Sequence, residues 1–332
     1  MSEKIFDIQM FAAGDVVNAT NSAELSAEMK TFYDKALITL AGPRLVHEQF
    51  GQKKPIPKGG GKTIEFRKFS KLPKALTPIT EGVTPTGNKL KVSAVTASVD
   101  QYGDYIEQTD LLELTAIDNT IVEATKELAD QAGLTLDTIV RNELVAGTNV
   151  MFVPKIGADG SVTEVTSRGD LDNTCRLRVK DVFKAAAELK AVNAPKIDGA
   201  YVAIIHPYVA YDLMQEAGDK WMDIQKYTNP EKIYKGEIGM LGGVRFVEST
   251  EAKIFEDGVF ATLFLGDNAY GVTDIEGGGL EHIVKQKGYG NDPLNQRSSV
   301  GWKATKVAKR LLEEYIIRFE SKSEFSETAE EN

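Results

Sequence analysis

The segment between residues 52 and 74 concentrates positive charge in a chain whose formal net charge is -10. Its only carboxylate is Glu65, and three consecutive glycines at 59–61 lie at its middle. Prolines flank the segment, and its apolar residues are scattered. A connecting segment of this length is either functional or disordered. Its basic residues are Lys53, Lys54, Lys58, Lys62, Arg67, Lys68, Lys71 and Lys74.

Apolar and polar residues alternate over residues 63–69, which favours a strand over disorder. A second strand is predicted at residues 92–105, so the segment reads as a two-stranded arm. Such an arm cannot bury its own apolar face and needs another surface to lie on. We therefore expect it to contact a neighbouring subunit. The predicted contact residues are Lys53, Lys54, Lys58, Lys62, Ile64, Phe66, Arg67 and Phe69.

A length of 332 residues suggests about two domains plus extensions. The chain is 42% hydrophobic and 27% charged, which is ordinary for a globular protein. Its mean hydropathy is -0.24 and it has no run of about 18 apolar residues, so no membrane span is expected. Asp7 and Gln9 interrupt the apolar stretch near the N-terminus, which argues against a signal peptide.

The sequence has few residues that could bind a metal or form a disulfide. Cys175 is the single cysteine, which excludes an internal disulfide and fits a reducing compartment. With one thiol and three scattered histidines, no structural zinc site or other cofactor site is expected. The net acidity also argues against a protein that grips duplex DNA.

Helical periodicity dominates residues 110–147 and predicts a helix of about 28 residues, roughly 42 Å long. Before the arm, residues 1–20 read as irregular, and a helix is expected from Asn21 to about Leu40. The carboxylates of Glu107, Asp110 and Glu113 lie near the start of the long helix, where a favourable interaction with the helix dipole explains them.

A second unit is predicted to begin near residue 179 with an amphipathic helix that ends before Pro195. Residues 201–205 read as a buried strand, and His206-Pro207 opens another helix, with proline in the first turn. Further strands are expected at 236–247 and 259–265. The acidic tail, residues 324–332, is expected to fray.

Two motifs resemble catalytic or nucleotide sites. Gly61-Lys62-Thr63 matches the end of a phosphate-binding P-loop, but Ile56 stands where the motif needs its first glycine, and the following residues read as a strand. His206 has no cysteine, serine or acidic partner in a recognisable motif, so a hydrogen-bonded structural histidine is expected. No catalytic residue is predicted, and the chain is not expected to be an enzyme.

The order of parts, together with several local strings, resembles the major capsid proteins of tailed phages, which have the Hong Kong 97 type fold. The strings are similar to the N-four-like major capsid protein family, and they are specific jointly over residues 20–320. They are Gly59-Gly60-Gly61-Lys62-Thr63, Ile79-Thr80-Glu81-Gly82, Tyr201-Val-Ala-Ile-Ile-His206-Pro207, Lys232-Ile233, Gly236-Glu237-Ile238-Gly239, Gly243-Val244-Arg245-Phe246-Val247-Glu248, Asp292-Pro293-Leu294-Asn295-Gln296-Arg297 and Gly301-Trp302-Lys303.

The resemblance implies an α+β fold and a structural protein that self-assembles, as hexamers and pentamers, into the icosahedral shell around a phage genome. It also implies the family's domains. These are an N-terminal arm and helix (1–50), an extended β-loop (51–105), a peripheral domain with a long spine helix (106–178 and 300–332) and an axial domain (179–299).

The implied partners are further copies of the chain, with separate scaffolding and portal proteins, and decoration proteins are left open. Packaged DNA would be met by non-specific proximity, and no membrane is involved. The implied location is the virion capsid, with assembly in the host cytoplasm. Two alternatives remain: an encapsulin-type cellular nanocompartment shell, which neighbouring genes would distinguish, and a P-loop-type nucleotide-binding enzyme, which a nucleotide titration with Lys62→Ala as control would detect.

Overall fold

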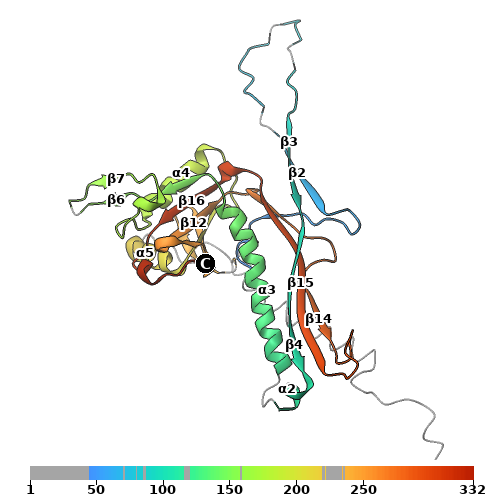
Figure 1. Cartoon of the computed structure of the whole chain (residues 1–332). Helices are drawn as coiled ribbons and strands as arrows, with labels where there is room; N and C mark the ends of the chain where they lie inside the picture. Colours follow the sequence, from blue (N-terminus) through green and yellow to red (C-terminus); the bar gives the residue numbers. More distant parts are fainter. Residues whose placement is uncertain are drawn as a thin grey trace, which may run out of the picture.

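The computed structural model describes residues 45–69, 72–79, 81–84, 87–115, 120–157, 159–218, 221, 234 and 236–332. The helix expected between Asn21 and Leu40 lies outside the described residues. Within them, two sheets are packed against helices, and a two-stranded ribbon projects away from both (Figure 1). The predicted α+β class is therefore confirmed.

The larger sheet has seven strands in the order β5-β16-β12-β8-β10-β9, with β11 paired to β12. β8 is a continuous apolar run and β12 is apolar except for Thr262, and every residue of both is buried, as expected for strands covered on both faces. The strands are β5 (Val150–Phe152), β8 (Tyr201–Ile205), β9 (Glu237–Leu241), β10 (Val244–Glu248), β11 (Ile254–Phe255), β12 (Val259–Leu265) and β16 (Ile316–Ser321).

Two helices pack against each other in this part of the molecule, α4 (Val179–Ala191) and α5 (Pro207–Ala217). Both were predicted from their apolar spacing. α5 begins directly after His206, whose Nδ1 accepts a hydrogen bond from the Tyr208 backbone N–H at 3.2 Å. The predicted role of His206 as a hydrogen-bonded structural residue is thus confirmed.

The second sheet is built around one long strand, β15, which pairs with β13, β14 and β4 along its length. β1 continues this sheet by pairing in parallel with β13. The strands are β1 (Gln52–Lys53), β4 (Asp100–Thr109), β13 (Tyr270–Thr273), β14 (Glu281–Lys285) and β15 (Arg297–Arg310).

Helix α3 (Thr120–Val145) lies along β15 and joins the two cores (Figure 1). Leu128 and Leu136 pack in one cluster with Trp302, and further along the helix Val140 and Leu144 insert into the core of the larger sheet. Its 26 residues span about 39 Å. The predicted helix of about 28 residues corresponds to α3, and a separate short helix, α2 (Asp110–Thr115), precedes it in the same stretch.

The projecting ribbon consists of β2 (Thr63–Phe69) and β3 (Val92–Ser98), paired antiparallel over seven residues (Figure 1). The strand predicted over 92–105 is divided in two, because the chain changes partner at Val99. There the backbone N–H bonds Lys62 O at 2.9 Å and the side chain is buried. β4 then continues along β15 instead of β2.

A strap, residues 45–56, fastens the base of the ribbon to both cores. The two carboxylate oxygens of Asp137, on α3, accept from the backbone N–H and the Nδ1–H of His47, at 2.8 Å and 2.6 Å. The Tyr270 hydroxyl donates to the His47 carbonyl, and Lys306 Nζ lies 2.6 Å from Glu48. His47 and Asp137 are both fully buried, so water cannot replace these bonds.

The strand pairing does not follow the domain ranges that were predicted from the sequence. β16 falls in the range 300–332, yet it pairs with β12 in the larger sheet, whereas β14 falls in 179–299 and pairs with β15. The tail is also not frayed, since Asn332 bonds the backbone of Ala252 and Ile254 through its side chain. The sequence reveals that these segments exist, but it gives no sign of the distant backbone segment with which each of them pairs.

Replacing Asp137 with alanine should lower the free energy of unfolding by about 3 kcal/mol, because two buried donors of His47 lose their acceptor. Urea denaturation followed by circular dichroism measures this. Glu127→Ala, on the exposed face of the same helix, is the matched control and should change stability by less than about 0.5 kcal/mol. Equal effects of the two substitutions would show that the strap is not held through Asp137.

Candidate assembly surface

The tip of the ribbon, residues 72–92, exposes large apolar side chains. Between 53% and 82% of the surface of each is accessible, far more than a segment packed on its own chain would leave. Exposed apolar patches of this kind mark interaction sites. The residues are Leu72, Leu76, Ile79, Val83, Leu90 and Val92.

The same tip is basic. Lys74, Lys89 and Lys91 are all exposed, and Glu81 is the carboxylate among them. Lysines beside exposed apolar residues keep such a segment soluble and also attract an acidic partner surface. The tip therefore combines an apolar contact area with a positive field.

The base of the ribbon is different, because Ile64 and Phe66 are buried within their own chain. They are 9% and 5% exposed and pack with Ile56 and Val99. The Phe66 ring lies so close to Gly271 that a Cβ there would be 2.5 Å from it. The expectation that the arm lacks a core of its own is therefore wrong at its base, and these two side chains are not free to contact a neighbour.

Three of the predicted basic contact residues also have partners in their own chain. Lys53 pairs with Glu48 at 3.2 Å, Lys62 with Asp100 at 2.9 Å, and Arg67 with Glu65 at 3.2 Å. All three cations remain mostly exposed, so these pairs contribute about 0–1 kcal/mol each and are readily exchanged.

The remaining predicted contact residues have mixed surroundings. Lys54 lies 6.0 Å from the centroid of the Phe66 ring, Lys58 is exposed, and the side chain of Phe69 is outside the described residues. A role of the basic residues at a subunit contact stays a prediction. The alternation of apolar and polar residues over 63–69 led to predicted contact residues at the base of the ribbon. The apolar residues of the tip follow no such period, so the sequence did not indicate them as contact residues.

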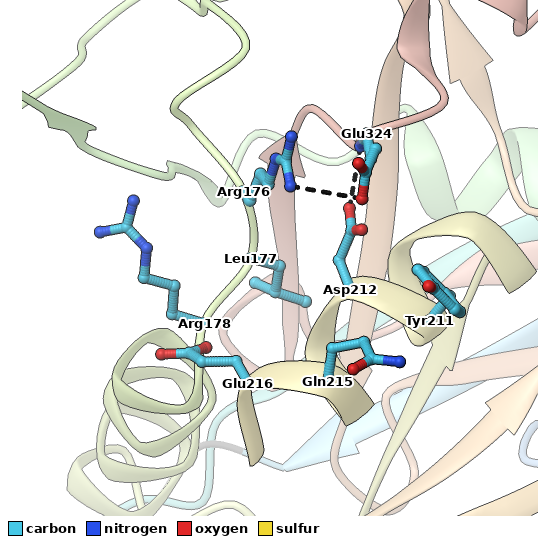
Figure 2. Close-up of a pocket in the computed structure, with 8 residues that line it drawn as sticks. All are labelled: Arg176, Leu177, Arg178, Tyr211, Asp212, Gln215, Glu216 and Glu324. Carbon is cyan, nitrogen blue, oxygen red and sulfur yellow. Dashed lines mark hydrogen bonds and ion pairs between the residues drawn. The ribbon is translucent and has the colours of Figure 1, made fainter. Parts of the chain in front are cut away.

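A hollow of about 490 Å³ lies where α5, the segment before α4 and the C-terminal tail meet (Figure 2). Its carboxylates are committed to the fold. Glu216 accepts from the Val179 N–H at 2.9 Å, Asp212 accepts from the Glu324 N–H at 3.0 Å, and Arg176 pairs with Glu324 at 3.6 Å. The arrangement ties the tail to α5 and to the segment before α4, and it ties α5 to the start of α4.

The described residues give little support for a catalytic nucleophile or for a nucleotide-binding site. Burial raises the pKa of the Cys175 thiol, which favours the unreactive protonated form. Thr63 begins β2, not the helix that a P-loop requires. No cluster of three or more histidine, cysteine or acidic residues is arranged to hold a metal in the described part of the chain. None of the described helices is long and apolar enough to span a bilayer.

Comparison with known protein families gives one match. A family model described as phage capsid protein matches residues 46–276. No curated protein matches the chain.

Several solved structures with a similar fold are phage capsids. The capsid of Ralstonia phage GP4 aligns with a TM-score of 0.64 at 17% identity, over 85% of this chain and 90% of that one. The capsid of Cyanophage P-SCSP1u aligns with 0.61 at 15% identity, over 96% and 92%. Cyanophage Pam1 gives 0.58 at 14%, over 79% and 85%. The expected Hong Kong 97 type fold is confirmed.

His206 should make the stability of the fold depend on pH, because burial lowers its pKa to about 4. The unfolded chain binds this proton near pH 6.5, so the stabilisation is complete above that pH and is lost as the pH falls toward 4. We expect the free energy of unfolding to fall by about 2 kcal/mol from this residue between pH 7.5 and 5.0. His206→Asn keeps a capping acceptor but does not titrate.

Urea denaturation of the wild type and His206→Asn at both pH values measures this difference. The variant should lose less stability than the wild type on acidification. Identical losses would assign the pH dependence to other groups.

Proposed function

The chain belongs to the phage capsid protein family, and on that premise we propose that its projecting ribbon carries the contacts by which copies associate. The protein is a major capsid protein, a structural subunit of an icosahedral shell. The observation that supports the role of the ribbon is its tip, where Leu76 and Ile79 are 82% and 76% exposed. A second subunit would bury these side chains.

The tip projects far from its own cores, so its partner is a neighbouring copy (Figure 1). On the exposed face of α3, Glu123 pairs with Lys126 at 2.7 Å, and Glu127 is the next exposed carboxylate, so we propose Glu127 as a partner for the lysines of the tip. Shell subunits need large interfaces, on the order of 2,000–5,000 Å² per contact. A ribbon fixed at its base by Ile64 and Phe66 offers area at its tip with little ordering cost.

The finer assignments belong to the same proposal. The chain forms hexamers and pentamers and acts without catalysis, with separate scaffolding and portal proteins and non-specific proximity to packaged DNA, while decoration proteins are left open. Residues 51–105 are the extended loop, and the names peripheral and axial domain apply to the units around β15 and around β12. Assembly takes place in the host cytoplasm and the product is the virion. The family match favours this reading over a nanocompartment shell.

Replacing residues 72–91 with a short Asn-Gly-containing turn should leave a folded protein that no longer assembles. The described residues of this segment are exposed, and Ile64 and Phe66 still hold the base, so the urea midpoint should stay near that of the wild type. Negative-stain microscopy and light scattering measure assembly. If the wild type itself remained at 36.3 kDa under all assembly conditions tested, the proposed function would be wrong.

Reversing charge at the tip separates electrostatics from shape. The triple variant Lys74→Glu, Lys89→Glu, Lys91→Glu should assemble more weakly than the wild type at low salt, and the difference should shrink near 0.5 M salt, where screening acts within about 5 Å. Each exposed pair contributes about 0–1 kcal/mol, but every contact in the shell repeats it. Unchanged assembly at low salt would leave the apolar residues as the contact.

A further inference from the structure

The hollow between α5, the segment before α4 and the C-terminal tail has the size and the lining of a small-molecule site (Figure 2). Its volume of about 490 Å³ lies within the range of about 300–1,000 Å³ that such sites occupy. One wall is the exposed side of α5, and the opposite wall is the extended segment 176–178. Glu324, from the tail, completes the lining.

Two arginines supply hydrogen-bond donors on one wall. Arg176 and Arg178 are two residues apart in an extended segment, so their side chains leave it on the same side, about 7 Å apart, and Leu177 between them is buried. Arg178 donates to the Thr174 carbonyl at 2.9 Å, whereas the 3.6 Å from Arg176 to Glu324 is too long for a hydrogen bond. Each guanidinium group carries five N–H donors, so both keep donors that make no hydrogen bond within the described residues.

The opposite wall supplies acceptors as well as donors. Asp212 is 9% exposed, and while its Oδ2 accepts from the Glu324 N–H at 3.0 Å, its Oδ1 makes no hydrogen bond within the described part of the chain. The exposed amide of Gln215, which can both donate and accept, makes none there either. Glu216 uses one carboxylate oxygen to accept from the Val179 N–H and keeps the other.

An aromatic ring lies at the edge of these polar groups. Tyr211 is 46% exposed, and its ring is held edge-to-face against Phe325, with centroids 5.6 Å apart and an interplanar angle of 70°. Its hydroxyl makes no hydrogen bond within the described residues. A ring that is fixed on one side and open on the other offers an apolar surface next to hydrogen-bonding groups.

The charges of the lining limit what the hollow can bind. The carboxylates of Asp212, Glu216 and Glu324 would repel an anion, and the two arginines would repel a cation. An apolar ligand would find only Tyr211 and the buried Leu177. An uncharged ligand with many hydroxyl groups fits best, because each hydroxyl both donates and accepts a hydrogen bond.

We propose that this hollow binds a saccharide. One face of a sugar ring packs on Tyr211, one hydroxyl accepts from Arg176, and another donates to Oδ1 of Asp212. The amide of Gln215 bonds a further hydroxyl from the same wall. This inference goes beyond the proposed function and does not depend on it, since the whole site lies within one chain.

Ligand-observed NMR on the full chain tests the proposal, with maltose, cellobiose and N,N′-diacetylchitobiose as probes. At least one of them should bind saturably, with a dissociation constant of about 1 mM or lower. Tyr211→Ala and Gln215→Ala should each weaken that binding about fivefold while the urea midpoint stays near that of the wild type, because both side chains are exposed. Tyr105→Ala, which removes a tyrosine on β4 that is 64% exposed, is the matched control and should bind as the wild type does.

Two results of these titrations would overturn the proposal. One is the failure of all three disaccharides to bind, and the other is wild-type binding by both Tyr211→Ala and Gln215→Ala. Glucose, glucuronate and glucosamine test the charge argument, since they share a ring and differ in charge. Glucose should bind most tightly at pH 7, and tighter binding of glucuronate would overturn the proposal by making the hollow an anion site.

A free saccharide and a polysaccharide share this chemistry, and beads of amylose, cellulose and chitin distinguish them. These are the polymers that correspond to the three disaccharides. Retention of the protein on the matching polymer, with elution by the disaccharide, would support the proposal with a polysaccharide as the ligand. Binding of the disaccharide without retention would support it with a small free saccharide.

Discussion

The packing of α3 along β15 determines where every other part of this molecule can be. The helix is shared between two cores, with Leu128 against Trp302 at one end and Leu144 in the core of the larger sheet at the other. The strap crosses this junction, and the buried pair of His47 and Asp137 fixes it there. Since the ribbon continues directly from the strap and into β4, its direction is set by the same few contacts.

Close backbone approach makes this junction possible. A Cβ at Gly103 would lie 2.5 Å from the Trp302 carbonyl oxygen, and one at Gly301 would lie 2.7 Å from the Tyr105 Cβ. Glycine at these two positions lets β4 and β15 pair over ten residues without a bulge. On the opposite face, Trp302 packs on α3 and its indole N–H donates to Gln131 at 3.1 Å. Successive residues of β15 thus point in turn to a flat face that contains glycine and to a tightly packed face against α3.

Local features of the fold could be predicted from the sequence, while contacts between distant segments could not. Apolar runs identified β8 and β12, helical spacing identified α4, and His206-Pro207 marked the start of α5, because the physics of each acts within a few residues. The bond between His47 and Asp137 spans 90 residues, and neither residue carries a signal of its partner. For the same reason the burial of Phe66 and the pairing of β16 with β12 required the structure.

The candidate surface shows the same division. Positive charge in the arm was visible in the sequence, but its residues at the base pair with Glu48 and Asp100 of the same chain. The lysines of the tip are better understood together with the apolar side chains around them. Leu76 and Ile79 would promote indiscriminate association if they stood alone, and Lys74 and Lys89 keep the unassembled subunit soluble through repulsion between like tips. In the proposed assembly, an acidic neighbour would remove that repulsion, so the charges that keep free subunits apart would also favour the proposed contact.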